Sequence, residues 1–122
     1  MDDIAIVKQA FAAFAACDLA TLEALSCVGL AVTNAPTGSV TGQQQYEGRG
    51  ALASYLSDVQ QVWDRLELRP ETFHSPRAGV VLVKGSAITR RDGASRQMPV
   101  AWSWTIVEGK IASVRVLSTA AV

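Results

Sequence analysis

The chain has 122 residues, the size of one domain with a buried core. Its net charge is zero, with 11 basic and 11 acidic residues spread along the sequence, so neither nucleic acid nor an anionic membrane surface is an expected partner. Hydrophobic residues make up 49% and charged residues only 18%, a composition that predicts an internal cavity, a subunit interface or both.

The two cysteines predict no metal site. Cys17 and Cys27 lack metal-ligand spacing and have no histidine nearby, and we expect no cofactor. The amino terminus is acidic where a secretory signal would be basic, and the longest apolar stretch, 10–17, is too short to span a membrane. We therefore expect a cytoplasmic protein in which both thiols are free.

Two helices are predicted near the amino terminus. Asp2 and Asp3 favour a helix start, and the apolar residues that follow fall on one stripe at helical spacing. The helix breaks at Cys17, where Asp18 caps a second, shorter helix that Gly29 ends.

A strand over 30–34 and an exposed loop or short edge ribbon over 37–45 come next. The segment 46–50 leads into a third helix. Its apolar stripe consists of Leu52, Tyr55, Leu56, Val59, Val62 and Trp63.

Strands are predicted over the rest of the chain, at 65–69, 80–89, 98–107 and 110–117. Pro70 limits the first of them to an edge or a bulge. Hairpin turns are expected at Asp92-Gly93 and Glu108-Gly109, and a longer turn at 75–79.

The last hairpin carries the most informative pattern in the chain. Because strand side chains alternate between faces, four of them point the same way: Val100, Trp102, Trp104 and Ile106. Two neighbouring indoles on one sheet face require a cover, and the helices of the first half supply it. The sequence predicts an α+β fold: a cone-shaped α+β barrel spanning 1–122, with three N-terminal helices packed on a strongly curved, mostly antiparallel sheet.

Three motifs stand in order along this layout. Ala16-Cys17-Asp18-Leu19 precedes the second helix, Tyr46-Glu47-Gly48-Arg49 precedes the third, and Trp104-Thr105-Ile106-Val107-Glu108-Gly109-Lys110-Ile111 forms the last hairpin. In this order they resemble the SnoaL-like branch of the nuclear-transport-factor-2-like (NTF2-like) superfamily over nearly the whole chain. That superfamily includes ketosteroid isomerases, polyketide cyclases and limonene-epoxide hydrolases, so the resemblance implies the fold and leaves the activity open.

The resemblance also implies catalytic groups that this chain lacks. The aspartate base of ketosteroid-isomerase-like members falls at Asn34, and their two oxyanion donors fall near Ala10 and Trp102. The acid of cyclase-like members falls within 117–120, which contains no carboxylate. These mechanisms do not transfer, and whether the protein is an enzyme stays open.

None of the 11 acidic residues is predicted to enter the cone. The remaining candidates for chemistry by hydrogen bonding are Asn34, which shares strand parity with two inward-facing residues, and Tyr46. Each also has a structural alternative, and the indoles and Tyr55 could simply be core. The candidate ligand-binding residues are Asn34, Tyr46, Tyr55, Trp63, Trp102, Trp104 and Ser118.

Three functions fit these patterns. The first is a small-molecule-binding protein with an apolar, aromatic-lined pocket that takes a ring-containing ligand. The second is an isomerase, polyketide cyclase or epoxide hydrolase that uses a carboxylate placed on the wrong face by a one-residue register error. The third is a non-catalytic interaction module. In each case a homodimer through the outer sheet face, at Thr105, Val107, Ser113, Arg115 and Leu117, is expected.

Overall fold

The computed structural model describes residues 2–33, 45–48, 50–62 and 65–118. Within them the elements follow in the order α1 (Asp3–Ala15), α2 (Leu19–Leu25), β1 (Ser26–Thr33), β2 (Gln45–Glu47), α3 (Ala51–Val62), β3 (Arg65–Arg77), β4 (Val80–Arg91), β5 (Ala94–Val107) and β6 (Lys110–Ser118).

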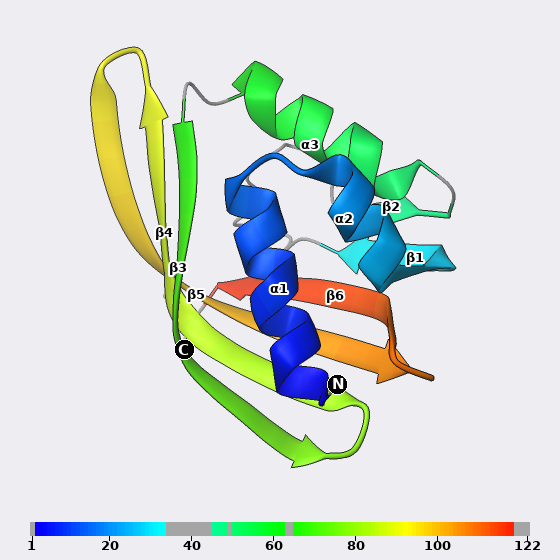
Figure 1. The fold of residues 1–122 in the computed structure, drawn as a ribbon. Helices are drawn as coiled ribbons and strands as arrows, with labels where there is room; N and C mark the ends of the chain where they lie inside the picture. Colours follow the sequence, from blue (N-terminus) through cyan, green and yellow to red (C-terminus); the bar gives the residue numbers. More distant parts are fainter. Residues whose placement is uncertain (1, 34–44, 49, 63–64, 119–122) are drawn as a thin grey trace.

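The strands form one curved sheet in the order β2-β1-β6-β5-β4-β3. Only the β1–β6 pair among the described strands is parallel, and the other neighbours are antiparallel. Figure 1 shows α1, α2 and α3 together on the inner side of the curve. The predicted class is therefore confirmed: the fold is a cone-shaped α+β fold with helices segregated to one side of a mostly antiparallel sheet.

Aspartate caps begin the first two helices, as predicted. The Asp2 carboxylate accepts a hydrogen bond from the Ala5 amide at 2.7 Å. The Asp18 carboxylate accepts from the Thr21 hydroxyl at 2.6 Å and the Thr21 amide at 3.2 Å, and these two bonds lower the Asp18 pKa. Since α2 has only seven residues, its cap is a large part of what defines it.

The start of β1 differs from the prediction. The second helix ends at Leu25, and β1 begins at Ser26, four residues before the predicted strand and before Gly29, the predicted end of the helix. The Ser26 hydroxyl donates to the Leu22 carbonyl at 2.7 Å, and Ser26 pairs with Ile111. A register shift between Ser26 and Ala31 accommodates the additional residues, so tertiary pairing overrides the local glycine signal.

Two further strands differ in extent. The segment expected only to lead into the third helix contains β2, in which Tyr46 pairs with Val32 of β1. β3 continues to Arg77, so the predicted five-residue turn shrinks to Ala78-Gly79. Pro70 behaves as predicted, because β3 is an edge strand and its register shifts directly after Pro70.

The hairpin turns match their sequence signals. In the first turn φ is 53° at Asp92 and 81° at Gly93. In the second turn φ is 51° at Glu108 and 76° at Gly109. Two successive left-handed residues are typical of the turns that suit twisted antiparallel strands. The predicted inward face of β5 is also confirmed, since all four of its residues are buried.

The helical layer is fixed to the far end of the sheet by a contact between distant parts of the chain. The Asp3 carboxylate accepts from the Gly79 amide at 2.8 Å, and the Gly79 carbonyl accepts from the Ile106 amide at 2.8 Å. Gly79 has a φ of +85°, and a Cβ there would lie 2.9 Å from the Ile106 carbonyl oxygen. Glycine is therefore required where α1, the β3–β4 turn and β5 meet.

Candidate functional site

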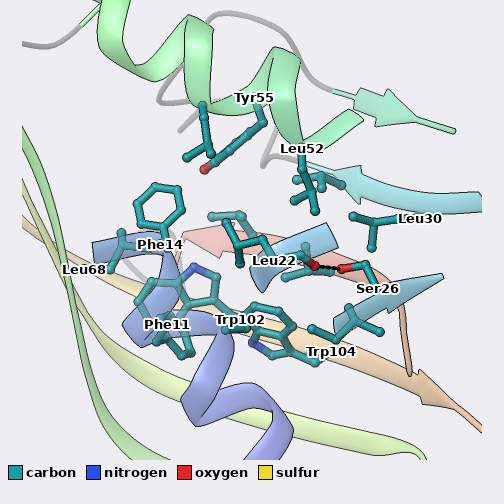
Figure 2. Close-up of a pocket in the computed structure, with 16 residues that line it drawn as sticks. Phe11, Phe14, Leu22, Ser26, Leu30, Leu52, Tyr55, Leu68, Trp102 and Trp104 are labelled. Carbon is teal, nitrogen blue, oxygen red and sulfur yellow. Dashed lines mark hydrogen bonds between the residues drawn. The ribbon is translucent and has the colours of Figure 1, made fainter. Parts of the chain in front are cut away.

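A small apolar cavity lies between the helices and the sheet, inside the curve of the cone. Its volume is about 60 Å³. The lining includes Trp102 and Trp104 of β5 and Val114 and Val116 of β6. Figure 2 shows Leu52 and Tyr55 of α3 across the cavity from the two indoles, with Phe11 of α1 beside the indoles. The described lining residues are Ala10, Phe11, Phe14, Leu22, Ser26, Leu30, Val32, Leu52, Tyr55, Leu56, Leu68, Trp102, Trp104, Ile111, Val114 and Val116.

An aromatic cluster fixes the position of both indoles. The Phe11 ring meets the Trp102 ring edge-on at 5.0 Å and the Trp104 ring at 5.3 Å, measured between centroids. On its other side Phe11 meets Phe73 of β3 at 6.2 Å. Edge-to-face pairs of this kind contribute about 0.5–1.5 kcal/mol beyond the area that they bury. The indoles are therefore held in place before any ligand arrives.

Tyr55 and Trp104 bring two hydrogen-bond donors to the cavity wall. Tyr55 reaches from α3 toward Phe14, 6.0 Å away between ring centroids, with its hydroxyl at the tip (Figure 2). Burial raises the pKa of that hydroxyl, and the nearby Tyr46 adds to the effect, so Tyr55 stays neutral. The buried Trp104 Nε1 has no hydrogen-bond partner in the part of the chain that the structure describes. Leaving such a group unpaired costs about 1–3 kcal/mol.

Behind Tyr55 lies a polar contact that the sequence analysis missed. The Tyr46 hydroxyl donates to the Asp58 carboxylate at 2.7 Å, which joins β2 to α3. The Tyr46 ring also meets the Tyr55 ring edge-on at 5.3 Å. Asp58 was expected to face away from the apolar stripe of the third helix, and it is only partly exposed. No sequence pattern indicated this contact, because Tyr46 lies in β2, a strand that was not predicted.

The structure brings three of the predicted ligand-binding residues together: Tyr55, Trp102 and Trp104 all line the cavity. Tyr46 is buried beside Tyr55, does not line the cavity and is engaged with Asp58. Asn34 and Trp63 lie outside the described residues. Ser118 pairs with Val100 at the end of β6, and its side chain lies outside what the structure describes.

The charged groups lie elsewhere. Among the described residues that line the cavity, none is ionisable except Tyr55. Within residues 2–33, 45–48, 50–62 and 65–118, no three metal-binding side chains come together. In the same part of the chain, no helix combines the length and apolar content needed to cross a membrane.

Comparison with known proteins identifies the fold. No protein-family model and no curated protein matches the sequence. Among solved structures, TerC co-crystallised with polyporic acid matches with a TM-score of 0.85 and 18% identity over 97% of this chain and 92% of that one. An NTF2-like protein from Burkholderia xenovorans LB400 matches with a TM-score of 0.70 and 27% identity over 93% and 86%. A candidate SnoaL-like polyketide cyclase from Jannaschia sp. CCS1 matches at 0.77 and 13% over 97% and 85%.

These matches confirm the resemblance noted from the three motifs. The chain has the fold of the NTF2-like superfamily, and SnoaL-like proteins are among its structural neighbours. Since one fold can host many functions, the fold does not decide what this chain binds or whether it catalyses a reaction.

Proposed function

We propose that this NTF2-like protein binds an apolar, ring-containing small molecule inside its cone. The observation that carries the proposal is the lining of the cavity: two indoles held by Phe11, aliphatic side chains around them, and the neutral hydroxyl of Tyr55. Apolar walls with a few polar groups are typical of small-molecule sites. Each 100 Å² of apolar ligand surface removed from water contributes about 2.5 kcal/mol.

The two donors in the cavity wall suggest which ligand fits best. A carbonyl or ether oxygen of the ligand would accept a hydrogen bond from the Tyr55 hydroxyl or from Trp104 Nε1. A carboxylate would meet no cation in the described lining, so its desolvation would go uncompensated. The ligand of this proposal is therefore neutral where it lies in the cone.

Ligand entry requires the walls to move apart. The cavity of about 60 Å³ is smaller than the engineered cavity of about 150 Å³ that admits benzene. Binding therefore involves an opening between the helices and the sheet, and its stabilisation of the folded protein rises with the logarithm of the ligand concentration above the dissociation constant. TerC, co-crystallised with polyporic acid, has the same fold, but the uncharged lining of this cavity disfavours an acid, so the neutral 1-acetylnaphthalene is the first compound to test.

The experiment compares two variants in which an alanine of α1 is replaced by leucine. Ala10 is buried and lines the cavity, so Ala10→Leu fills the space, whereas Ala12→Leu on the exposed side of the same helix is the matched control. Wild type and Ala12→Leu should show quenching of tryptophan fluorescence and a raised melting temperature with 1-acetylnaphthalene. Ala10→Leu should show neither. Unchanged binding by folded Ala10→Leu would place the ligand elsewhere.

One observation favours a second candidate, an enzyme acting on the same class of ligand. The partly exposed Asp58 carboxylate contacts Tyr46, which packs on Tyr55, so a carboxylate stands one tyrosine behind the cavity wall. Mass spectrometry of bound ligands after long incubation tests this candidate. Turnover that Asp58→Asn abolishes would support an enzyme, and ligand recovered unchanged would support a binding protein.

We also propose a homodimer through the outer face of the sheet. Leu82 of β4 and Val107 of β5 are 40% and 53% exposed, and both point away from the cone on the face that carries Thr105. Light scattering should give twice the 12.9 kDa monomer mass, and Leu82→Glu should restore the monomer. A wild-type monomer at micromolar concentration would contradict the dimer.

A cytoplasmic location is the last part of the proposal. It is supported by Cys17 and Cys27, which form no disulfide and suit a reducing compartment. Cell fractionation with an antibody to the protein checks it, and recovery from an oxidising compartment would overturn it.

A further inference from the structure

A second cavity adjoins the first and differs from it in chemistry. This cleft, of about 140 Å³, lies between α2, β1 and the start of α3. It is lined by Glu23, Ser26, Cys27, Leu30, Gly48, Gly50, Ala51 and Leu52. Three of these residues, Ser26, Leu30 and Leu52, also line the apolar cavity, so they form the partition between the two spaces. Figure 2 shows all three on the same side of the site, opposite Phe14 and Leu68.

The partition consists of side chains with room to move. Leu52 and Ser26 are partly exposed, and only Leu30 is fully buried. On the cleft side, a Cβ added to Gly48 or Gly50 would meet no atom within 4 Å, so the backbone there borders open space. The cleft has more than twice the volume of the cavity. It offers space for a substituent of a ligand whose ring lies in the cone.

The cleft is polar where the cavity is not. Glu23 is its one charged side chain among the described lining residues, and it forms no ion pair within the described part of the chain. The neighbouring cation, Lys110 of β6, donates instead to the Ala24 carbonyl at 2.5 Å. A free carboxylate favours a hydrogen-bond donor, above all a cationic one, and disfavours an anion.

We propose that the cavity and the cleft are two halves of one binding site for an amphiphilic ligand. The apolar ring lies in the cone, and a donor-bearing polar end, a hydroxyl or an amine, passes Leu52 and reaches Glu23. This inference rests on the proposed function and adds to it the class of ligand and the direction in which the ligand lies.

The test uses three probes with one aromatic body: 1-methylnaphthalene, 1-naphthylmethylamine and 1-naphthoate. Dissociation constants come from tryptophan fluorescence of the full chain. The amine should bind wild type about fivefold more tightly than the carboxylate, the factor expected for one solvent-exposed ion pair. Glu23→Gln should remove this preference and leave 1-methylnaphthalene unaffected. Glu71→Gln, at an exposed position on β3 outside both spaces, is the matched control and should keep the preference.

A second variant tests the partition. Leu52→Trp places a larger side chain between the two spaces and should weaken the amine more than 1-methylnaphthalene. Equal binding of amine and carboxylate, or a preference that survives Glu23→Gln, would overturn the two-part site and leave the proposed function intact. Failure of all three probes to bind wild type would overturn both.

Discussion

The two buried tyrosines provide a sharp test, because their hydroxyls differ in one respect. The Tyr46 hydroxyl donates to the Asp58 carboxylate, whereas Tyr55 lines the apolar cavity, where no charged side chain of the described residues reaches it. Hydrogen bonds to a charged group contribute about 1.5–3 kcal/mol to stability. Asp58 is partly exposed and water replaces part of the bond, so we expect Tyr46→Phe to cost about 1–2 kcal/mol.

Tyr55→Phe removes a hydroxyl that lies in an apolar cavity wall. We expect it to leave the free energy of unfolding unchanged or to raise it by up to about 1 kcal/mol. Thermal and urea unfolding of both variants measures this, and a chain of this size shifts by roughly 4 °C per kcal/mol. The same Tyr55→Phe should weaken 1-acetylnaphthalene about tenfold, since the ligand oxygen loses its donor.

The difference in stability between the two variants tests whether the Tyr55 hydroxyl is available to a ligand. Equal destabilisation by Tyr46→Phe and Tyr55→Phe would mean that Tyr55 has a partner in the folded protein, and the proposed donor would no longer be free to meet a ligand.

Three further predictions follow from the fold. The Asp18 pKa is lowered in the folded state, so the contribution of Asp18 to stability is present above the unfolded pKa near 3.8 and is lost as the pH falls through the folded pKa. In acid unfolding followed by circular dichroism, the stability of Asp18→Asn should therefore depend less on pH than that of the wild type. The Tyr55 pKa is raised, so stability is lost as the pH rises above the unfolded value near 10.0, and Tyr55→Phe should reduce this alkaline loss. A Cβ at Gly85 would lie 2.0 Å from the Arg69 carbonyl oxygen, so Gly85→Ala should cost about 3 kcal/mol or more, while Gly29→Ala, which meets no atom within 4 Å, should cost far less in the same urea titration.

Residue periodicity was sufficient to predict most of the strands in the sheet. The alternation of β5 and the left-handed turn signals predicted its inward face and both hairpins, because strand period and turn geometry are local properties of the chain. Pro70 correctly marked an edge strand with a bulge for the same reason.

The misplaced elements are those that depend on distant partners. β1 starts at Ser26 because β6 offers a partner there, and β2 exists because β1 offers an edge to three residues with no strand pattern of their own. Tertiary pairing of this kind cannot be read from a window of ten residues.

The predictions for the candidate site also divide into local features, which the sequence indicates, and contacts between distant elements, which it does not. Trp102, Trp104 and Tyr55 were placed correctly in the cone by their position on an apolar face. The contact of Asp58 with Tyr46 joins two elements 12 residues apart, and the cleft beside Glu23 forms where α2, β1 and α3 meet. Neither leaves a pattern along the sequence.

The parallel β1–β6 pair has a consequence for how the chain reaches this state. Ala31 finds its partner Ser113 only after some 80 residues of intervening chain have been made. The β3–β6 meander has short hairpins and can form without the rest of the chain. The early helices and β1 are synthesised before it, so their apolar sides have no sheet to pack against until the meander has been made. Long-range closure of this kind slows folding, so the nascent protein passes through a stage that chaperones would shield before the indoles are covered.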